Sequence, residues 1–239
     1  ERGSGSVPDR LETVEARVAP PERYRRIPVE PGSFAAWLRS MPLLPGGAIV
    51  RDYRGRQRVP ASDTSLAAVS ACIISNRRLD QCMDIIMRMH TAWLLDRERP
   101  EDIVFPLPDG LSFSWDQWRQ GYRPAFAGTS FSLSRTAEAD AGPGSFERYL
   151  RTLFSYTGTQ AFYHYYPDVA PDSAAIGDFI VKKGRNGHGV LIVDMVESGN
   201  GHKKALIGQG DTPACRFYLL KGKNGENWID INDAETPLR

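Results

Sequence analysis

The sequence predicts an α+β fold with a central antiparallel sheet flanked by helices, and three observations support this prediction. Patterns typical of amphipathic helices dominate the first two thirds of the chain. Apolar runs of strand length, separated by glycine-rich turns, fill the last third as in an antiparallel meander. The chain has 239 residues and is 41% hydrophobic, so a single domain can bury a substantial core.

The first 23 residues carry Gly, Ser, Pro and charge with few large apolar side chains. Such a segment gains too little from burial to offset its ordering entropy. We therefore expect a flexible tail at 1–23 and one domain at 24–239. The opening stretch ERGSGSVPD is typical of the linker that follows a removed export signal, and a fusion scar would look the same.

The next hundred residues alternate between helix and strand patterns. Ser33 is a candidate cap for the first helix, and Ser114 with Gln117 forms a capping box for the last. The strongest helical pattern carries its apolar residues, together with Cys82 and His90, on one face. The predicted elements are a helix at 34–41, strands at 48–53 and 66–74, a helix at 79–97, a strand at 103–107 and a helix that ends at Gly121.

Residues 124–143 are rich in small residues and predict a loop. A second amphipathic helix follows over 145–159, capped by Ser145. Four strands complete the chain, over residues 179–183, 188–195, 203–208 and 215–221.

Composition excludes several classes of protein. The formal net charge is +1, which provides no field for binding nucleic acid. Apolar runs are far shorter than the roughly 20 residues of a membrane-spanning helix. No HExxH motif, Walker loop or dinucleotide fingerprint occurs, so the sequence predicts neither a metal nor a cofactor.

His188 is the best candidate for a catalytic histidine, because it follows a glycine-rich hairpin and opens an apolar strand. If the next hairpin turns around residues 199–200, paired residue numbers add up to about 399. His188 then faces Asp211, and Gln209 lies close by. Such a polar neighbour fixes the imidazole tautomer, and the histidine can then serve as the general base for a nucleophile.

Cys82 is the best candidate for that nucleophile, since a helix start favours the thiolate form of a cysteine. If Asp80 caps the helix, Cys82 occupies its second position, and if the helix starts at Asn76, Cys82 lies a turn deeper. Free cysteines are also common core residues, so a structural role fits the same pattern. Cys72 and Cys215 lack a comparable setting.

Trp115 and Trp118, with Tyr122, could form a stacking surface for a sugar or a peptide, and core packing is the alternative. The remaining histidines fit structural roles, on a helix face, in an aromatic patch and in a turn respectively: His90, His164 and His202.

Five segments, in this order, resemble the bacterial family known as domain of unknown function 4846: PVEPGSFAAWLRSM, LDQCMDIIMRM, SFSWDQWRQGYR, FERYLRTLFSYTGT and IGDFIVKKGRNGHGVLIVDM. The resemblance spans residues 24–220 and is most specific at Gln81–Cys82 and Gly187–His188. Members of that family are mostly exported or lipid-anchored, so the resemblance implies a periplasmic, lipid-anchored or extracellular protein.

The chain also resembles, more distantly, the NlpC-type cysteine peptidases of the papain-like group. That resemblance implies a papain-like arrangement with Cys82 as nucleophile, His188 as base and Gln209 as orienting residue, with Asp211 as the other candidate for the third role. We therefore expect a cysteine hydrolase, an amidase or peptidase acting on cell-wall peptides. The alternative is a non-catalytic exported domain that binds glycan or peptide.

Overall fold

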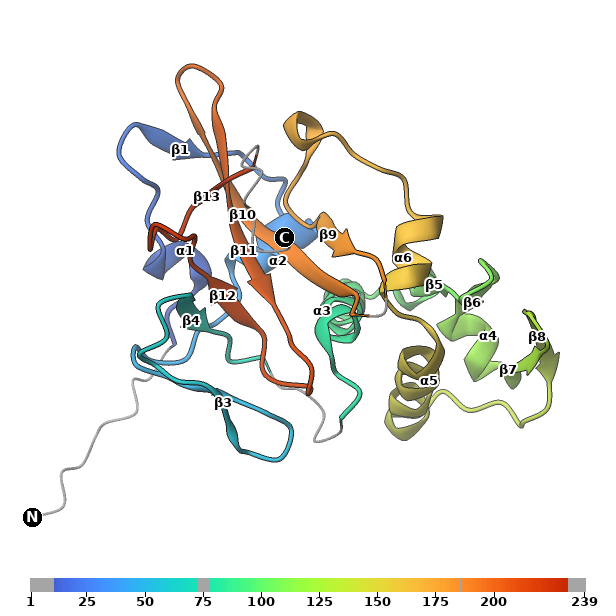
Figure 1. Ribbon diagram of the computed structural model, residues 1–239. Helices are drawn as coiled ribbons and strands as arrows, with labels where there is room; N and C mark the ends of the chain where they lie inside the picture. The colour runs from blue at the N-terminus through green and yellow to red at the C-terminus, as the bar shows by residue number, and fades with distance from the viewer. Residues whose placement is uncertain (1–10, 73–77, 185, 232–239) are drawn as a thin grey trace, which may run out of the picture.

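The computed structural model describes residues 11–72, 78–184 and 186–231 (Figure 1). Its main sheet has the strand order β1–β10–β11–β12–β4, with β9 also paired to β10 and β13 to β11. Every pairing in this sheet is antiparallel. The mixture of helices with an antiparallel sheet confirms the α+β class that the sequence predicts.

The strands of the main sheet are β1 (Tyr24–Arg26), β4 (Leu66–Val69), β9 (Phe179–Lys182), β10 (His188–Ser198), β11 (Lys203–Gln209), β12 (Tyr218–Leu220) and β13 (Ile229–Asp230). Three separate hairpins pair β2 (Val50–Arg51) with β3 (Gln57–Val59), β5 (Val104–Pro106) with β6 (Ser112–Ser114), and β7 (Tyr122–Ala127) with β8 (Ser130–Arg135). The α-helices are α1 (Val14–Arg17), α2 (Phe34–Arg39), α3 (Cys82–Asp96), α4 (Trp115–Arg119), α5 (Pro143–Tyr156) and α6 (Thr159–Tyr165). Single 3₁₀ turns are η1 (Pro100–Asp102) and η2 (Pro171–Ser173).

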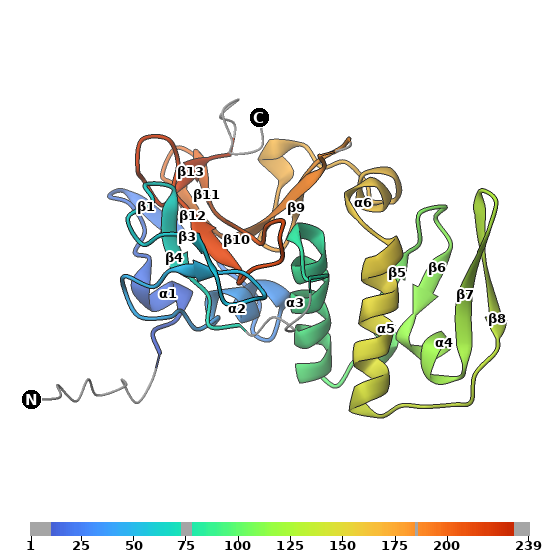
Figure 2. The same ribbon diagram turned by 60° about the horizontal axis from the view of Figure 1, so that its bottom comes forward.

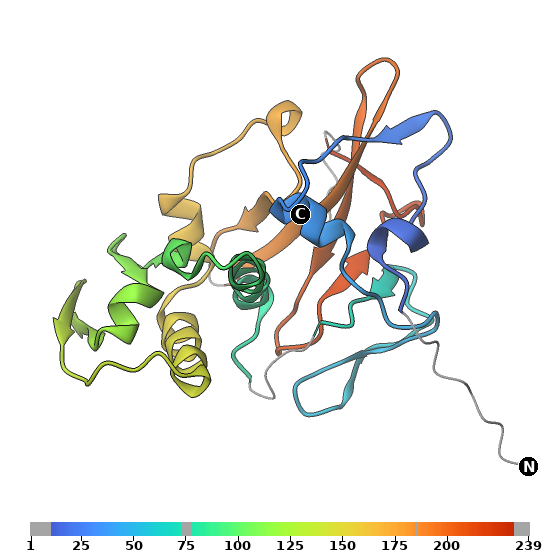
Figure 3. The same ribbon diagram turned by 180° about the vertical axis from the view of Figure 1, so that it is seen from behind.

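Helices α2 and α3 cover one face of the sheet, and Figure 3 shows both in front of β10. Leu38 of α2 and Met83 of α3 share a core with Leu191 and Val193 of β10. Beyond α3 lies α5, followed by α4 and the hairpins β5–β6 and β7–β8 (Figure 2). Helix α3, which begins with Cys82, therefore lies between the sheet and α5.

The opposite face of the sheet encloses a second core. Val50 and Val59, from the β2–β3 hairpin, pack there with Val190 and Ile207 of the long central strands. The sheet thus curls around apolar side chains on this side while α2 and α3 cover the other. No helix among the described residues is long and apolar enough to cross a membrane.

Several parts of the chain differ from the sequence expectation. The strand expected at 66–74 ends at Val69, and residues 73–74 of that prediction lie outside the described residues. Val14 and Val18 are buried, so packed structure begins ahead of Tyr24, inside the expected tail. The expected loop at 124–143 contains most of the β7–β8 hairpin, whose strands expose small polar residues and so show no apolar pattern. The aromatic patch around His164 forms helix α6.

Candidate active site

Helix α3 begins at Cys82, which is its first residue, with Gln81 as N-cap. The N-cap amide donates a hydrogen bond to the Asp84 carboxylate over 3.1 Å, which holds the first turn. The expected cap at Asp80 is one residue too early. Residues 78–81 are not helical, so the structure also excludes the deeper placement of the cysteine. The first amides of a helix have no acceptor within it, and those of Cys82 and Met83 occupy that position. Cys82 itself is 7% exposed.

His188 is the first residue of β10 and is half-buried. Its imidazole lies beside the Cys82 thiol. The thiol raises the pKa of His188 above its usual value; burial opposes the shift, and Gln209 and Asp211 add to it. The protonated imidazole is thus favoured beside the sulfur, as a thiolate–imidazolium pair requires.

Gln209, the last residue of β11, fixes the tautomer of His188. Its Nε2 donates to the Tyr218 hydroxyl over 2.6 Å, so its Oε1 is the atom that faces His188 Nε2 at 2.8 Å. An amide oxygen only accepts hydrogen bonds, so Nε2 of the imidazole must carry the proton. In the neutral ring Nδ1 is then the unprotonated nitrogen, available to accept the thiol proton.

Asp211, the other candidate for this role, is turned to a different partner. Its carboxylate accepts from the Arg58 guanidinium over 2.8 Å. It influences His188 through its charge, without a hydrogen bond to the ring. The next residue, Thr212, donates its hydroxyl to Gln81 Oε1 over 3.1 Å, so the loop after β11 contacts the N-cap of α3.

Two glycines permit the close approach of α3 to the sheet. A Cβ atom at Gly189 would lie 2.1 Å from Sδ of Met83. A Cβ atom at Gly210 would lie 2.8 Å from Cγ2 of Ile85 and 3.6 Å from Cα of Cys82. Both distances to side-chain atoms are shorter than van der Waals contact, so a side chain at either glycine would displace Met83 or Ile85 from its present position.

The three residues predicted to bind substrate do not form an open surface. Trp115 and Trp118 are 5% and 4% exposed and belong to the main core. The Trp118 indole N–H donates to the buried Ser145 hydroxyl over 2.9 Å. Tyr122 is half-buried in β7. The spacing of the tryptophans reflects core packing, which is the alternative that the sequence offered.

The remaining thiols and histidines have partners other than Cys82 and His188. All three cysteines are free, and burial raises the pKa of both Cys72 and Cys215, the latter to about 12. His90 packs against Phe34 and Trp93. His202 is hydrogen-bonded to Tyr24 and Asp230 at the opposite end of β10. Within the described residues no cluster of three or more His, Cys, Asp or Glu side chains could hold a metal ion.

Sequence reasoning missed Tyr218 and the two packing glycines. Tyr218 lies in the apolar run CRFYLLK, where a tyrosine is indistinguishable from a core aromatic residue. Gly189 directly follows His188, and Gly210 follows Gln209. Small residues beside two candidate polar residues are the one signal that could have indicated a close helix contact.

Comparison with known proteins places the chain in a family of unknown function. The family model described as domain of unknown function (4846) matches residues 14–239. Neither the curated proteins nor the solved structures contain a match.

Proposed function

The chain belongs to the family described as domain of unknown function (4846), and we propose that it is a cysteine hydrolase that cleaves amide bonds. The observation that carries this proposal is the juxtaposition of the Cys82 thiol, at the start of α3, with the His188 imidazole, at the start of β10. Gln209 and Tyr218 support it, because they leave Nδ1 of the imidazole as the base. Peptides of the bacterial cell wall are the first substrates to test.

The reaction begins when His188 Nδ1 takes the proton of the Cys82 thiol. The thiolate attacks the amide carbonyl carbon, and the backbone amides at the start of α3 stabilise the negative oxygen. His188 returns its proton to the leaving nitrogen as the C–N bond breaks, which gives a thioester and a free amine. Water, deprotonated by His188, then hydrolyses the thioester to a carboxylic acid and restores the thiol.

The proposal includes a papain-like arrangement, in which a helix-start cysteine faces a histidine and a polar residue on neighbouring strands. The chain order of Cys82, His188 and Gln209, and their positions on α3, β10 and β11, support it. A cell-wall substrate also requires export, which cell fractionation would test.

The binding alternative has less support, because Trp115 and Trp118 are buried and Cys82 contacts His188.

The test is the rate of Cys82 alkylation by iodoacetamide between pH 5 and 9, followed by mass spectrometry of the peptide that contains Cys82. We expect the rate at pH 6.5 to fall about tenfold or more in His188→Ala, because the imidazole no longer takes the thiol proton. His164→Ala, on α6, is the matched control and should react like wild type. Equal rates at every pH in wild type and His188→Ala would overturn the proposal.

Hydrolysis is then measured on digests of cell-wall peptides. Wild type should release new amino and carboxyl groups in equal amounts, whereas Cys82→Ala should release neither. Cleavage that persists in Cys82→Ala would exclude the cysteine as nucleophile.

A further inference from the structure

Two exposed cations lie on the segments that carry the Cys82–His188 pair, one opposite His188 in the sheet and one in the turn before α3. Lys182 is the direct cross-strand partner of His188 in the β9–β10 pair. Side chains directly opposite in an antiparallel pair project from the same face of the sheet, so Lys182 leaves the sheet next to the imidazole. On the other side, Arg78 lies in the turn before α3, and its carbonyl accepts from Gln81 Nε2 over 3.3 Å.

Both cations lack a counter-ion among the described residues. Lys182 and Arg78 are exposed, and neither forms an ion pair with a described carboxylate. Their charges therefore face solvent, where another molecule can meet them.

The acidic groups near the site do not cancel these charges. Asp211 is paired with Arg58, and the buried Asp80 is paired with Arg88. Burial raises the pKa of Asp84 to about 8, so at neutral pH this carboxyl group is largely uncharged. The N-terminus of α3 adds a partial positive charge of its own. The surroundings of Cys82 thus carry excess positive charge on a chain whose formal net charge is only +1.

We propose that the substrate of this site is an acidic peptide, with a carboxylate near the scissile amide that Lys182 and Arg78 attract. This inference rests on the proposed hydrolase function and names its substrate class. A carboxylate suits both cations, since each can donate charge-assisted hydrogen bonds to it.

A pair of alkylating reagents that differ in charge tests the proposal without a known substrate. Iodoacetate is anionic and iodoacetamide is neutral, and both form a thioether at Cys82 with loss of iodide. We expect Lys182→Gln and Arg78→Gln each to lower the iodoacetate-to-iodoacetamide rate ratio about two- to threefold, and the double variant to lower it further. Raising ionic strength from about 0.01 M to 1 M should lower the ratio in wild type as the Debye length shrinks.

Arg25→Gln is the matched control. Arg25 is exposed on β1 opposite Glu197, about 30 Å along β10 from His188. Its removal should leave the ratio unchanged. A ratio that does not respond to Lys182→Gln, Arg78→Gln or salt would overturn the inference.

Protection experiments link the charge to substrate. An acetylated glutamyl peptide should slow iodoacetamide labelling of Cys82 more than its glutaminyl counterpart, and Lys182→Gln should remove the difference. Equal protection by the two peptides would contradict an acidic substrate. The hydrolase proposal fails separately, if labelling by iodoacetamide does not depend on His188.

Discussion

At the scale of single residues, the direction of one amide group decides which nitrogen of His188 can act as a base. Gln209 has its orientation fixed by donation to Tyr218 over 2.6 Å. Without that bond the amide could rotate by half a turn and present its NH₂ group to the imidazole. His188 Nε2 would then have to accept, and the proton would move to Nδ1, where it blocks proton transfer from Cys82.

Tyr218→Phe tests this chain of hydrogen bonds. We expect Cys82 alkylation at pH 6.5 to slow about three- to tenfold, with a small loss of stability of about 1 kcal/mol from the missing hydrogen bond. Tyr24→Phe removes a tyrosine–histidine hydrogen bond at the other end of β10, Tyr24 with His202, and is the matched control. If Cys82 in Tyr218→Phe were alkylated with the same pH dependence as in wild type, the Gln209 amide would keep its orientation without the hydrogen bond to Tyr218.

A second prediction at this scale concerns the ionisation of Asp84. Burial, assisted by the charge of Asp80, raises the pKa of Asp84 to about 8, against the bond from Gln81 and the charge of Arg88. Between pH 4 and 8 the folded state therefore binds a proton that the unfolded chain has lost, so stability must fall as pH rises through this window.

Asp84→Asn keeps an acceptor for the Gln81 amide and removes the ionisation. From pH 5 to 8.5 the free energy of unfolding of wild type should fall by about 2–5 kcal/mol more than that of the variant. Urea denaturation of both proteins at the two pH values measures the difference. Parallel pH dependence in the two proteins would mean that Asp84 is ionised in the folded state.

At the scale of elements, the site depends on how closely the first turn of α3 approaches β10. Gly189→Ala would place a methyl group 2.1 Å from Met83 Sδ in a packed core. We expect a loss of about 1–3 kcal/mol in stability and slower alkylation of Cys82, because Met83 follows it in the helix.

Two further variants give this prediction its controls. A Cβ atom added at Gly199 would have no other atom within 4 Å, and this glycine has no positive φ, so Gly199→Ala should be neutral. Adding Met83→Ala to Gly189→Ala removes the clash and should restore the alkylation rate. If Gly189→Ala alone labels at the wild-type rate, the position of Cys82 does not depend on this contact.

The β10–β11 pair shows what local sequence can predict. Leu191 pairs with Gly208, which is the register that the turn residues predict at the site. Nearer the turn the register differs by one residue, as in the pair of Glu197 with Lys203, and an irregularity between Ile192 and Asp194 makes the change. Bulges respond to long-range contacts, so a prediction based on the turn alone could not include this one.

The same distinction separates the predicted from the missed parts of the site. Cys82 and His188 each carry a local signal, a helix start and a strand start, and their meeting follows from the fold. Tyr218 and Gly210 have roles that depend only on their neighbours in space. No hydrophobic periodicity or sequence motif therefore sets them apart from other residues of the same type. The β7–β8 hairpin was missed for the same kind of reason, since Phe126 and Phe131 pack on each other and the strands have no buried face.

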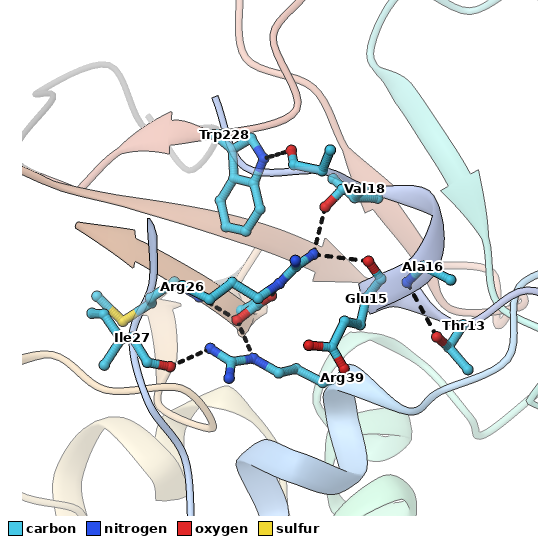
Figure 4. A network of polar contacts seen from close by, with 11 residues as sticks. Thr13, Glu15, Ala16, Val18, Arg26, Ile27, Arg39 and Trp228 are labelled. Atoms are coloured by element: carbon cyan, nitrogen blue, oxygen red, sulfur yellow. Dashed lines mark hydrogen bonds and ion pairs between the residues drawn. The ribbon is translucent and has the colours of Figure 1, made fainter. Parts of the chain in front are cut away.

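At the scale of the whole molecule, a buried ionic network joins the N-terminal segment to the sheet that holds His188 (Figure 4). Asp194 of β10 is fully buried and accepts from Arg26 over 2.8 Å and from Arg39 over 2.7 Å. Arg26 also donates to the carbonyls of Glu15 and Val18. One carboxylate thereby holds α1, β1 and α2 against the central strand.

Asp194→Asn separates the stability of this assembly from the chemistry of the site. The variant leaves the buried Arg39 and the half-buried Arg26 without their counter-ion, and we expect a loss of about 3–5 kcal/mol in the free energy of unfolding. Asp102→Asn breaks an exposed ion pair with Arg99 and should cost well under 1 kcal/mol. Asp194 lies six residues along β10 from His188, about 20 Å. Folded Asp194→Asn should therefore alkylate Cys82 within about twofold of wild type, and a much larger drop would mean that the N-terminal network sets the geometry of the site.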